Sequence, residues 1–121
     1  MAPVTTSVLI VDDDPSFRAL AAQLLRADGF EVAGCAADAK EALDKVRSRR
    51  PDAVLLDLNL ADLHGLDLAT RLVAEEGQQG ILLTSSDPHG ASDELARECG
   101  AVGFLPKTLL AGRDLSRYLC S

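Results

Sequence analysis

Five short apolar runs alternate with amphipathic segments along this chain. The runs are residues 8–11, 30–33, 53–56, 81–83 and 102–105. Each is short, as the apolar run of a buried β-strand is. The run at 53–56 has no polar alternation, which indicates a strand that is covered on both faces. The pattern therefore predicts a sheet of five strands.

Between these runs, apolar residues recur at helical spacing. The first helical face consists of Phe17, Leu20, Ala21, Leu24 and Leu25. Asp14-Pro15 before it reads as an N-cap followed by a first-turn proline, and Gly29 ends the segment. Similar patterns predict four more helices: from Asp38 to before Pro51, around 66–73, over 92–98 and over 109–119.

The regular alternation of strands and helices predicts the fold class. Strand–helix units repeated five times favour an α/β fold, a doubly wound five-stranded parallel sheet with five helices on its two faces. A length of 121 residues suits one domain with a real core and is short for two. We therefore expect a single domain over 1–121, with 1–7 as a loose N-terminus.

Polar side chains follow four of the predicted strands, and in parallel sheets ligands bind beyond these carboxyl ends. They are Asp12-Asp13-Asp14 after the first strand, Asp57 after the third, Thr84-Ser85-Ser86-Asp87 after the fourth and Pro106-Lys107 after the fifth. Carboxylates, hydroxyls and one ammonium group are therefore expected to converge on one edge.

This combination of groups suits aspartyl-phosphate chemistry. Carboxylates packed closely repel one another unless a cation neutralises them, and Mg²⁺ prefers a few carboxylates plus waters. Lys107 adds a positive point charge, and a Ser or Thr hydroxyl can donate to a phosphoryl oxygen. One carboxylate would be the nucleophile while the others hold the metal.

Four segments together resemble one family. The segments are VLIVDDDPSFR, LLDLNL with Gly65, TSSD and GAVGFLPK. In this order and spacing, over about residues 7–119, the chain resembles the response-regulator receiver domain of two-component signalling. The resemblance implies the flavodoxin-like strand order 2-1-3-4-5. It also implies Mg²⁺ as cofactor and a phosphoryl group accepted from a histidine kinase or histidine phosphotransfer protein.

The resemblance implies a role for each acidic residue. Asp57 corresponds to the phospho-acceptor, and Asp12 and Asp13 to the acidic pair that holds Mg²⁺. Asp13 is the more direct ligand, while Asp12 acts mainly through water. The backbone carbonyl of Asn59 is a further ligand. Asp14 is left as the cap of the first helix.

The resemblance also implies a switch. Lys107 pairs with the phosphoryl group, and Phe104 corresponds to an aromatic side chain that changes rotamer. Such a residue is more often plain core, and its switch role rests wholly on the resemblance. The switch hydroxyl is either Thr84 or Ser85, and the spacing to Lys107 favours Ser85. Thr108 stands where many members have a cis-proline, so Lys107 must be positioned in another way.

Charge and composition exclude several classes of function. The net charge of −7 argues against direct nucleic-acid binding. No apolar run is long enough to cross a bilayer, and 1–7 does not resemble a signal peptide. Cys35, Cys99 and Cys120 match no metal or redox spacing, which favours reduced thiols in a cytoplasmic protein. We therefore expect a protein target downstream, and a phosphorylation-dependent dimer is left open.

Two rival functions share some of these residues. A phosphatase of the haloacid-dehalogenase type also uses aspartate, Mg²⁺ and lysine, but its nucleophile follows the first strand. A pseudo-receiver would bind partners without phosphorylation, but such members usually lose the acceptor, an acidic residue or the lysine, and this chain keeps all of them. A receiver catalyses its own phosphoryl transfer and hydrolysis without being a conventional enzyme, and this remains the first hypothesis.

Overall fold

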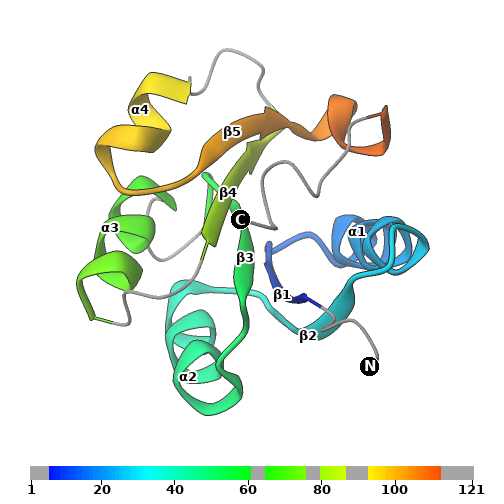
Figure 1. Ribbon diagram of the computed structural model, residues 1–121, viewed down its shortest axis with the longest axis horizontal. Coiled ribbons are helices and arrows are strands. Elements are labelled where there is room, and N and C mark those ends of the chain that lie inside the picture. Colours follow the sequence, from blue (N-terminus) through cyan, green and yellow to red (C-terminus); the bar gives the residue numbers. More distant parts are fainter. Residues whose placement is uncertain (1–5, 61–64, 76–79, 87–92, 113–121) are drawn as a thin grey trace, which may run out of the picture.

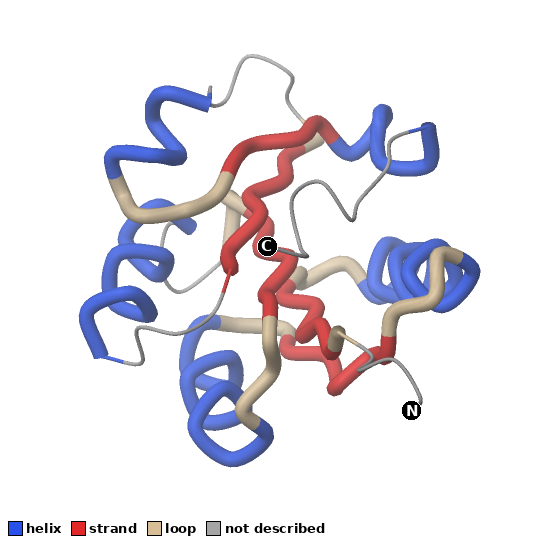
Figure 2. Tube along the Cα trace, viewed as in Figure 1, coloured by secondary structure: helices blue, strands red, loops and turns tan. Residues whose placement is uncertain are grey.

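The computed structural model describes residues 6–60, 65–75, 80–86 and 93–112. Along the chain the elements are β1 (Ser7–Val11), α1 (Pro15–Ala27), β2 (Glu31–Ala36), α2 (Ala39–Arg49), β3 (Ala53–Asp57), α3 (Gly65–Glu75), β4 (Gly80–Ser85), α4 (Asp93–Glu98), β5 (Gly103–Pro106) and the 3₁₀-helix η1 (Lys107–Gly112). Strands and helices alternate as the sequence predicts (Figures 1 and 2).

The five strands form one parallel sheet in the order β2-β1-β3-β4-β5. This confirms the predicted sheet and its strand order. Helix α1 lies on one side of the sheet, while α2, α3 and α4 lie on the other (Figure 1). The carboxyl ends of β1, β3, β4 and β5 consequently share one edge, because all the strands run in the same direction.

The expected number of helices needs a correction. Among the described residues there are four α-helices rather than five, and 109–112 belong to a 3₁₀-helix instead of starting an α-helix. Gly112 ends this turn, and glycine costs about 1 kcal/mol relative to alanine inside an α-helix. The rest of the predicted fifth helix, 113–119, lies outside the described residues.

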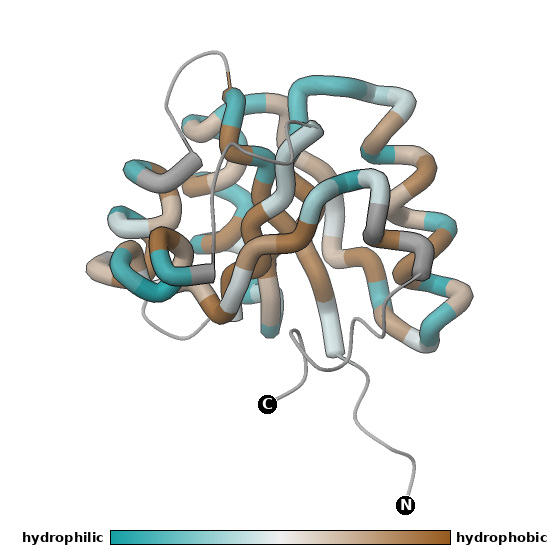
Figure 3. The backbone as a smooth tube through the Cα atoms, turned by 90° about the horizontal axis from the view of Figure 1, so that it is seen from above, coloured by the Kyte–Doolittle hydropathy of each residue, from teal (hydrophilic) through white to brown (hydrophobic). Residues whose placement is uncertain are grey.

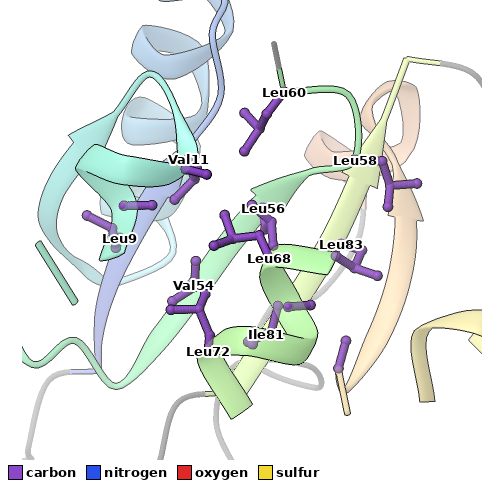
Figure 4. Close-up of a cluster of buried hydrophobic side chains, with 14 of the residues drawn as sticks. Leu9, Val11, Val54, Leu56, Leu58, Leu60, Leu68, Leu72, Ile81 and Leu83 are labelled. Carbon is purple, nitrogen blue, oxygen red and sulfur yellow. The ribbon is translucent and has the colours of Figure 1, made fainter. Parts of the chain in front are cut away.

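The sheet separates two apolar layers. Val54 and Leu56 pack with α2 and α3 on one face, whereas Ala53 and Leu55 pack with α1 on the other. Side chains from β1, β3, β4 and α3 point toward one another in the first layer, and Figure 3 shows the apolar strands at the centre (Figures 3 and 4). Burial on both faces explains why 53–56 shows no polar alternation.

The N-cap of α1 directs the loop after β1. The Asp14 carboxylate accepts a hydrogen bond of 2.9 Å from the backbone N–H of Ser16, and Pro15 begins the helix. This confirms Asp14 as the cap. Leu20 was predicted to lie on the buried apolar face of this helix, but 54% of its surface is exposed. The cap ends the first β–α connection within three residues, leaving Asp12 and Asp13 at the edge of the sheet.

Two helices end in the same way. Gly29 and Gly100 have φ angles of 90° and 91°, and the residue after each donates to the carbonyl five positions earlier. These bonds are the mark of a Schellman motif, in which glycine avoids the penalty of the left-handed region. The two positions differ in space: a Cβ on Gly29 would meet nothing within 4 Å, but one on Gly100 would lie 2.8 Å from Val73 Cγ2.

We expect Gly100→Ala to destabilise the protein more than Gly29→Ala. Both variants place alanine at positive φ, which costs about 1–2 kcal/mol, and only Gly100→Ala adds crowding, worth about 1–3 kcal/mol. Urea unfolding measures both. In a Val73→Ala background, Gly100→Ala should lose little more unfolding free energy than Gly29→Ala. The loss caused by Gly29→Ala should be the same with or without Val73→Ala. Equal losses in the two single variants would contradict the crowding argument.

Candidate functional site

Three carboxylates meet at the carboxyl ends of β1 and β3. One oxygen from each of Asp12, Asp13 and Asp57 lies within 4.8 Å of the others. Strands β1 and β3 are neighbours whose register pairs Val11 with Leu56, so the residues that follow them are adjacent. Asp12 and Asp57 are buried, and Asp13 is exposed. The sheet therefore brings together the three acidic residues that the sequence predicted to converge.

The backbone around Asp12 is held by local hydrogen bonds. Its Oδ1 accepts from the N–H of Asp14 at 2.9 Å, and its carbonyl oxygen accepts from Arg18 Nη1 at 2.7 Å. Arg18 lies on the first turns of α1, so the helix and the end of the strand are tied at two points. The first bond orients the side chain of Asp12, and the second holds its backbone.

Lys107 reaches this cluster from β5, at the far end of the sheet order. Its Nζ lies 2.6 Å from Asp12 Oδ2 and 3.8 Å from Asp57 Oδ2. Asp12 Oδ2 is fully buried and accepts no regular hydrogen bond from the described residues, so the ion pair with Lys107 offsets its charge. Removing Lys107 would leave a buried carboxylate uncompensated, which is strongly destabilising.

The crowding of carboxylates changes the pKa of Asp57. Burial raises the pKa of its carboxyl above the ordinary value, and the charges of Asp12 and Asp13 raise it further. Lys107 and the N–H of Asn59, which donates to Asp57 Oδ1 at 3.3 Å, lower the pKa without cancelling the rise. Because the pKa of Asp57 is higher in the folded protein, ionisation of this carboxyl lowers the free energy of unfolding. The loss begins as pH rises above the pKa of the unfolded chain and is complete above the pKa of the folded protein.

Asn59 links Asp57 to one of the two candidate hydroxyls. Its Nδ2 donates to Ser85 Oγ at 3.3 Å. Thr84 is the residue paired with Asp57 across β3 and β4, and both hydroxyl residues are buried. Successive side chains on a strand face opposite sides, so Thr84 and Ser85 point to different faces of the sheet. Of the two, Ser85 is the one whose hydroxyl has a hydrogen bond to the loop after Asp57.

The other predicted site residues are divided between core and undescribed segments. Phe104 is buried in the apolar layer shared with α3 and α4. Asp87, which follows the candidate hydroxyls, lies outside the described residues. One contact was not predicted: the ring of Phe17 lies under Lys107, with Nζ 4.3 Å from its centroid. Helical spacing identified Phe17 only as core, because no local pattern links α1 with the end of β5.

The donor set fits a hard divalent cation. The converging atoms are all oxygens, and two of the three carboxylates are buried. Mg²⁺ prefers a few carboxylates while keeping several waters, and the exposure of Asp13 leaves one side of the cluster open to solvent. Electrostatic repulsion and ligand type therefore both favour a cation here.

Comparison with known proteins identifies the family. The sequence model of the response regulator receiver domain matches residues 8–118. This chain belongs to the response regulator receiver family. Receiver domains are the regulated modules of two-component signalling, and the segments that carried the sequence resemblance lie within the matched range. The five-stranded sheet in the order 2-1-3-4-5 agrees with that assignment.

Individual relatives show what this receiver is similar to. The DNA-binding response regulator MtrA of Mycolicibacterium smegmatis is 42% identical over 113 residues, which cover 86% of this chain and 47% of MtrA. Protein-glutamate methylesterase/protein-glutamine glutaminase 2 of Vibrio vulnificus is 33% identical over 86% of this chain and 31% of that protein. The receiver thus spans less than half of either relative.

A solved structure gives the same assignment. Chemotaxis protein CheY4 of Vibrio cholerae superposes with a TM-score of 0.82 at 27% identity, covering 96% of this chain and all of that one. Within the described part of the receiver, no helix combines the length and the apolar character that crossing a bilayer requires.

We expect Asp57→Asn to stabilise the receiver in the absence of divalent cations. The change removes one of three crowded charges, a repulsion on the order of 1 kcal/mol or more at the effective dielectric of such sites. Thermal unfolding at neutral pH, with chelator present, should show a higher midpoint than wild type. The gain should shrink as pH falls toward the ordinary aspartate pKa, where the wild-type carboxyl becomes protonated.

Asp44→Asn is the matched control, because Asp44 is an exposed aspartate on α2, away from the cluster. It should leave the midpoint nearly unchanged. Mg²⁺ should narrow the difference between wild type and Asp57→Asn by stabilising the wild type more. If Asp57→Asn lowered the midpoint in chelator, the inferred repulsion would be wrong.

Proposed function

We propose that this receiver accepts a phosphoryl group on Asp57 from a histidine kinase or a histidine phosphotransfer protein, with Mg²⁺ as cofactor. The observation that carries the proposal is the meeting of Asp57 with Asp12, Asp13 and Lys107 at the carboxyl edge of the sheet. Asp12 is also buried and lies beside the same lysine, so the choice of Asp57 as acceptor rests on its position after β3, which corresponds to the acceptor position of the receiver family.

The transfer is a nucleophilic displacement at phosphorus. A carboxylate oxygen of Asp57 forms a P–O bond while the P–N bond of the donor phosphohistidine breaks, and the leaving imidazole takes up a proton. The product is an acyl phosphate. Water then attacks phosphorus, the P–O bond to Asp57 breaks, and inorganic phosphate leaves. This hydrolysis resets the receiver.

The acidic cluster supplies the metal site of this proposal. Asp13 and Asp57 would bind Mg²⁺ directly, together with the backbone carbonyl of Asn59, and Asp12 would act mainly through water. When bound, Mg²⁺ offsets the negative charge of the carboxylates and of the transferred phosphoryl group. Lys107 provides the second positive charge, which lies close enough to Asp57 to meet a phosphoryl oxygen.

Ser85 and Phe104 would link phosphorylation of Asp57 to a conformational change on the surface of the receiver. Ser85 is the better candidate for the switch hydroxyl because Asn59 already links it to the acceptor loop. Phe104 packs on the same side of the sheet as α3 and α4. A hydroxyl that moves toward the phosphoryl group would release space for this ring, so a local charge would bias a two-state element.

The output is proposed to be a protein contact in the cytoplasm. Leu95 on α4 and Val102 just before β5 expose 41% and 46% of their surface, which gives this side apolar contact area. The net charge of −7 disfavours direct binding to nucleic acid. The DNA-binding and methylesterase activities in the names of the two relatives belong to those longer proteins.

Incubation with Mg²⁺ and acetyl phosphate should add one phosphoryl group to the wild type. Intact mass spectrometry should show a single gain that is absent in Asp57→Asn and absent in chelator. Asp44→Asn, which keeps the cluster intact, should be labelled like wild type. No gain, even with a candidate kinase, would favour the pseudo-receiver, and turnover of a small phosphate ester would favour the phosphatase.

Ser85→Ala and Thr84→Ala should separate the two candidate hydroxyls. Both variants should still accept phosphate, because Asp57 and the acidic pair are unchanged. NMR of the Phe104 ring should show a phosphorylation-dependent shift in wild type and in Thr84→Ala, and a much smaller shift in Ser85→Ala. The reverse pattern would assign the switch to Thr84.

A further inference from the structure

We propose that Phe17 is a positioning residue for Lys107, holding the lysine ammonium on its ring face within reach of Asp57. This inference rests on the proposed phosphoryl transfer and adds a component that motif spacing does not indicate. Phe17 lies on α1, and Lys107 follows β5, so only the folded chain brings them together. The contact distance from Nζ to the ring centroid is 4.3 Å.

Lys107 needs such a partner because its nearest charges compete. Its Nζ lies 2.6 Å from Asp12 Oδ2 and 3.8 Å from Asp57 Oδ2, so direct ion pairing draws it toward Asp12. A lysine ammonium is a point charge on a flexible four-carbon stem and is not oriented by its own geometry. An aromatic face adds a directional attraction on a third side of the ammonium group.

The ring itself is well fixed. Phe17 is 8% exposed and packs with Ala21, Leu25 and Leu110 in the layer on the α1 side of the sheet. The ring also lines the apolar groove that includes Lys107 and Thr108. A rigid ring under a flexible ammonium restricts the positions that Nζ samples and excludes water from one side. Lys107 is accordingly only 19% exposed at its side chain.

Phe30 offers a matched control for the plain core role. It is 7% exposed and belongs to the same apolar layer as Phe17, but it lies just before β2, away from the acidic cluster. Phe30→Leu and Phe17→Leu each remove one buried ring and keep an apolar side chain. A core role predicts similar effects of the two variants, whereas a positioning role predicts different effects on phosphorylation.

The test measures the rate of labelling by acetyl phosphate over a range of donor and Mg²⁺ concentrations. Phe17→Leu should lower the maximal rate by about threefold to thirtyfold, the rate equivalent of a partly desolvated cation–π contact, with little change in half-saturating donor. Phe30→Leu should keep the wild-type rate while losing similar stability. Replacing Phe17 by pentafluorophenylalanine keeps the ring's shape but removes its negative face, and should slow labelling without unfolding the protein.

The dependence on Lys107 decides the mechanism. In a Lys107→Met background, Phe17→Leu should have no further effect on the rate. An equal effect in both backgrounds, or equal rates for Phe17→Leu and Phe30→Leu, would overturn the proposal. If wild type accepts no phosphate, the proposed function fails separately. The double-mutant cycle on urea unfolding then still measures coupling between positions 17 and 107, and zero coupling would overturn the contact.

A second inference comes from the outer edge of β2. We infer that a row of charged side chains on α2 covers this edge against strand addition by a second copy of the chain. Arg49 Nη1 donates to the carbonyl of Ala33 at 2.6 Å, and Lys45 Nζ donates to the carbonyl of Cys35. Glu41 lies one turn before Lys45, 3.8 Å from its Nζ, and accepts from the N–H of Ala37 just after the strand at 2.9 Å. An edge strand leaves such groups unpaired unless something occupies them.

The spacing of the two elements explains the match. Lys45 and Arg49 are four residues apart, about 6 Å along a helix, while their partners Cys35 and Ala33 are two residues apart, about 6.6 Å along a strand. The carbonyl of Ala36 accepts from Asp12 N–H, toward β1, so the carbonyl of Cys35 faces the open edge. One helical row therefore follows one edge of the strand.

Gly34 makes room for this row. The register between β1 and β2 shifts after Val8, and Gly34 has a φ angle of 152°. A Cβ on Gly34 would lie 3.0 Å from Arg49 Nη1, so a larger residue would push the guanidinium away from Ala33. The glycine, the irregular register and the charged row thus act together at the exposed strand.

The triple variant Glu41→Ala/Lys45→Ala/Arg49→Ala tests this inference without phosphodonor. Light scattering after size exclusion should show concentration-dependent association that exceeds wild type. Lys40→Ala/Asp44→Ala/Arg47→Ala removes the same set of charges from exposed positions on the same helix and should match wild type. The same oligomeric state in both triple variants would overturn the inference, as would association that leaves hydrogen exchange of β2 amides unprotected.

Discussion

The site depends on one electrostatic constraint, the burial of Asp12 and Asp57 beside each other at the end of an apolar sheet. Two carboxylates in this position raise the free energy of the folded state unless cations lie close by. Lys107 supplies one positive charge and is close enough to contact both. The remaining repulsion destabilises the metal-free protein, and it also favours binding of a divalent cation. The proposed chemistry at Asp57 therefore depends on the same repulsion.

The parallel sheet converts this local cost into a stable arrangement. Large apolar layers on both faces hold β1, β3 and β5 in place, and each buried aliphatic side chain contributes about 1.5–3 kcal/mol. That stabilisation offsets the repulsion at the edge. In the order β2-β1-β3-β4-β5, Lys107 follows the last strand, and its side chain extends across the edge of the sheet to Asp12 and Asp57.

Two contacts made by long cationic side chains add to this framework. Phe17 lies under Lys107, where it limits the freedom of a charge that Asp12 would otherwise draw away from Asp57. At the opposite side of the sheet, Lys45 and Arg49 occupy the outward carbonyls of β2. Both features use long cationic side chains at positions fixed by packing, one beside the acceptor and one at an exposed strand.

The sequence by itself determined the strand–helix alternation, the caps and the acidic residues that converge. These depend on local periodicity and on the rule that parallel strands end at one edge. Tertiary structure alone decided the 3₁₀ geometry after Lys107, the exposure of Leu20 and the contact between Phe17 and Lys107. It also linked Ser85 rather than Thr84 to Asn59. Such features depend on distances between segments far apart in the chain, about which local patterns carry no information.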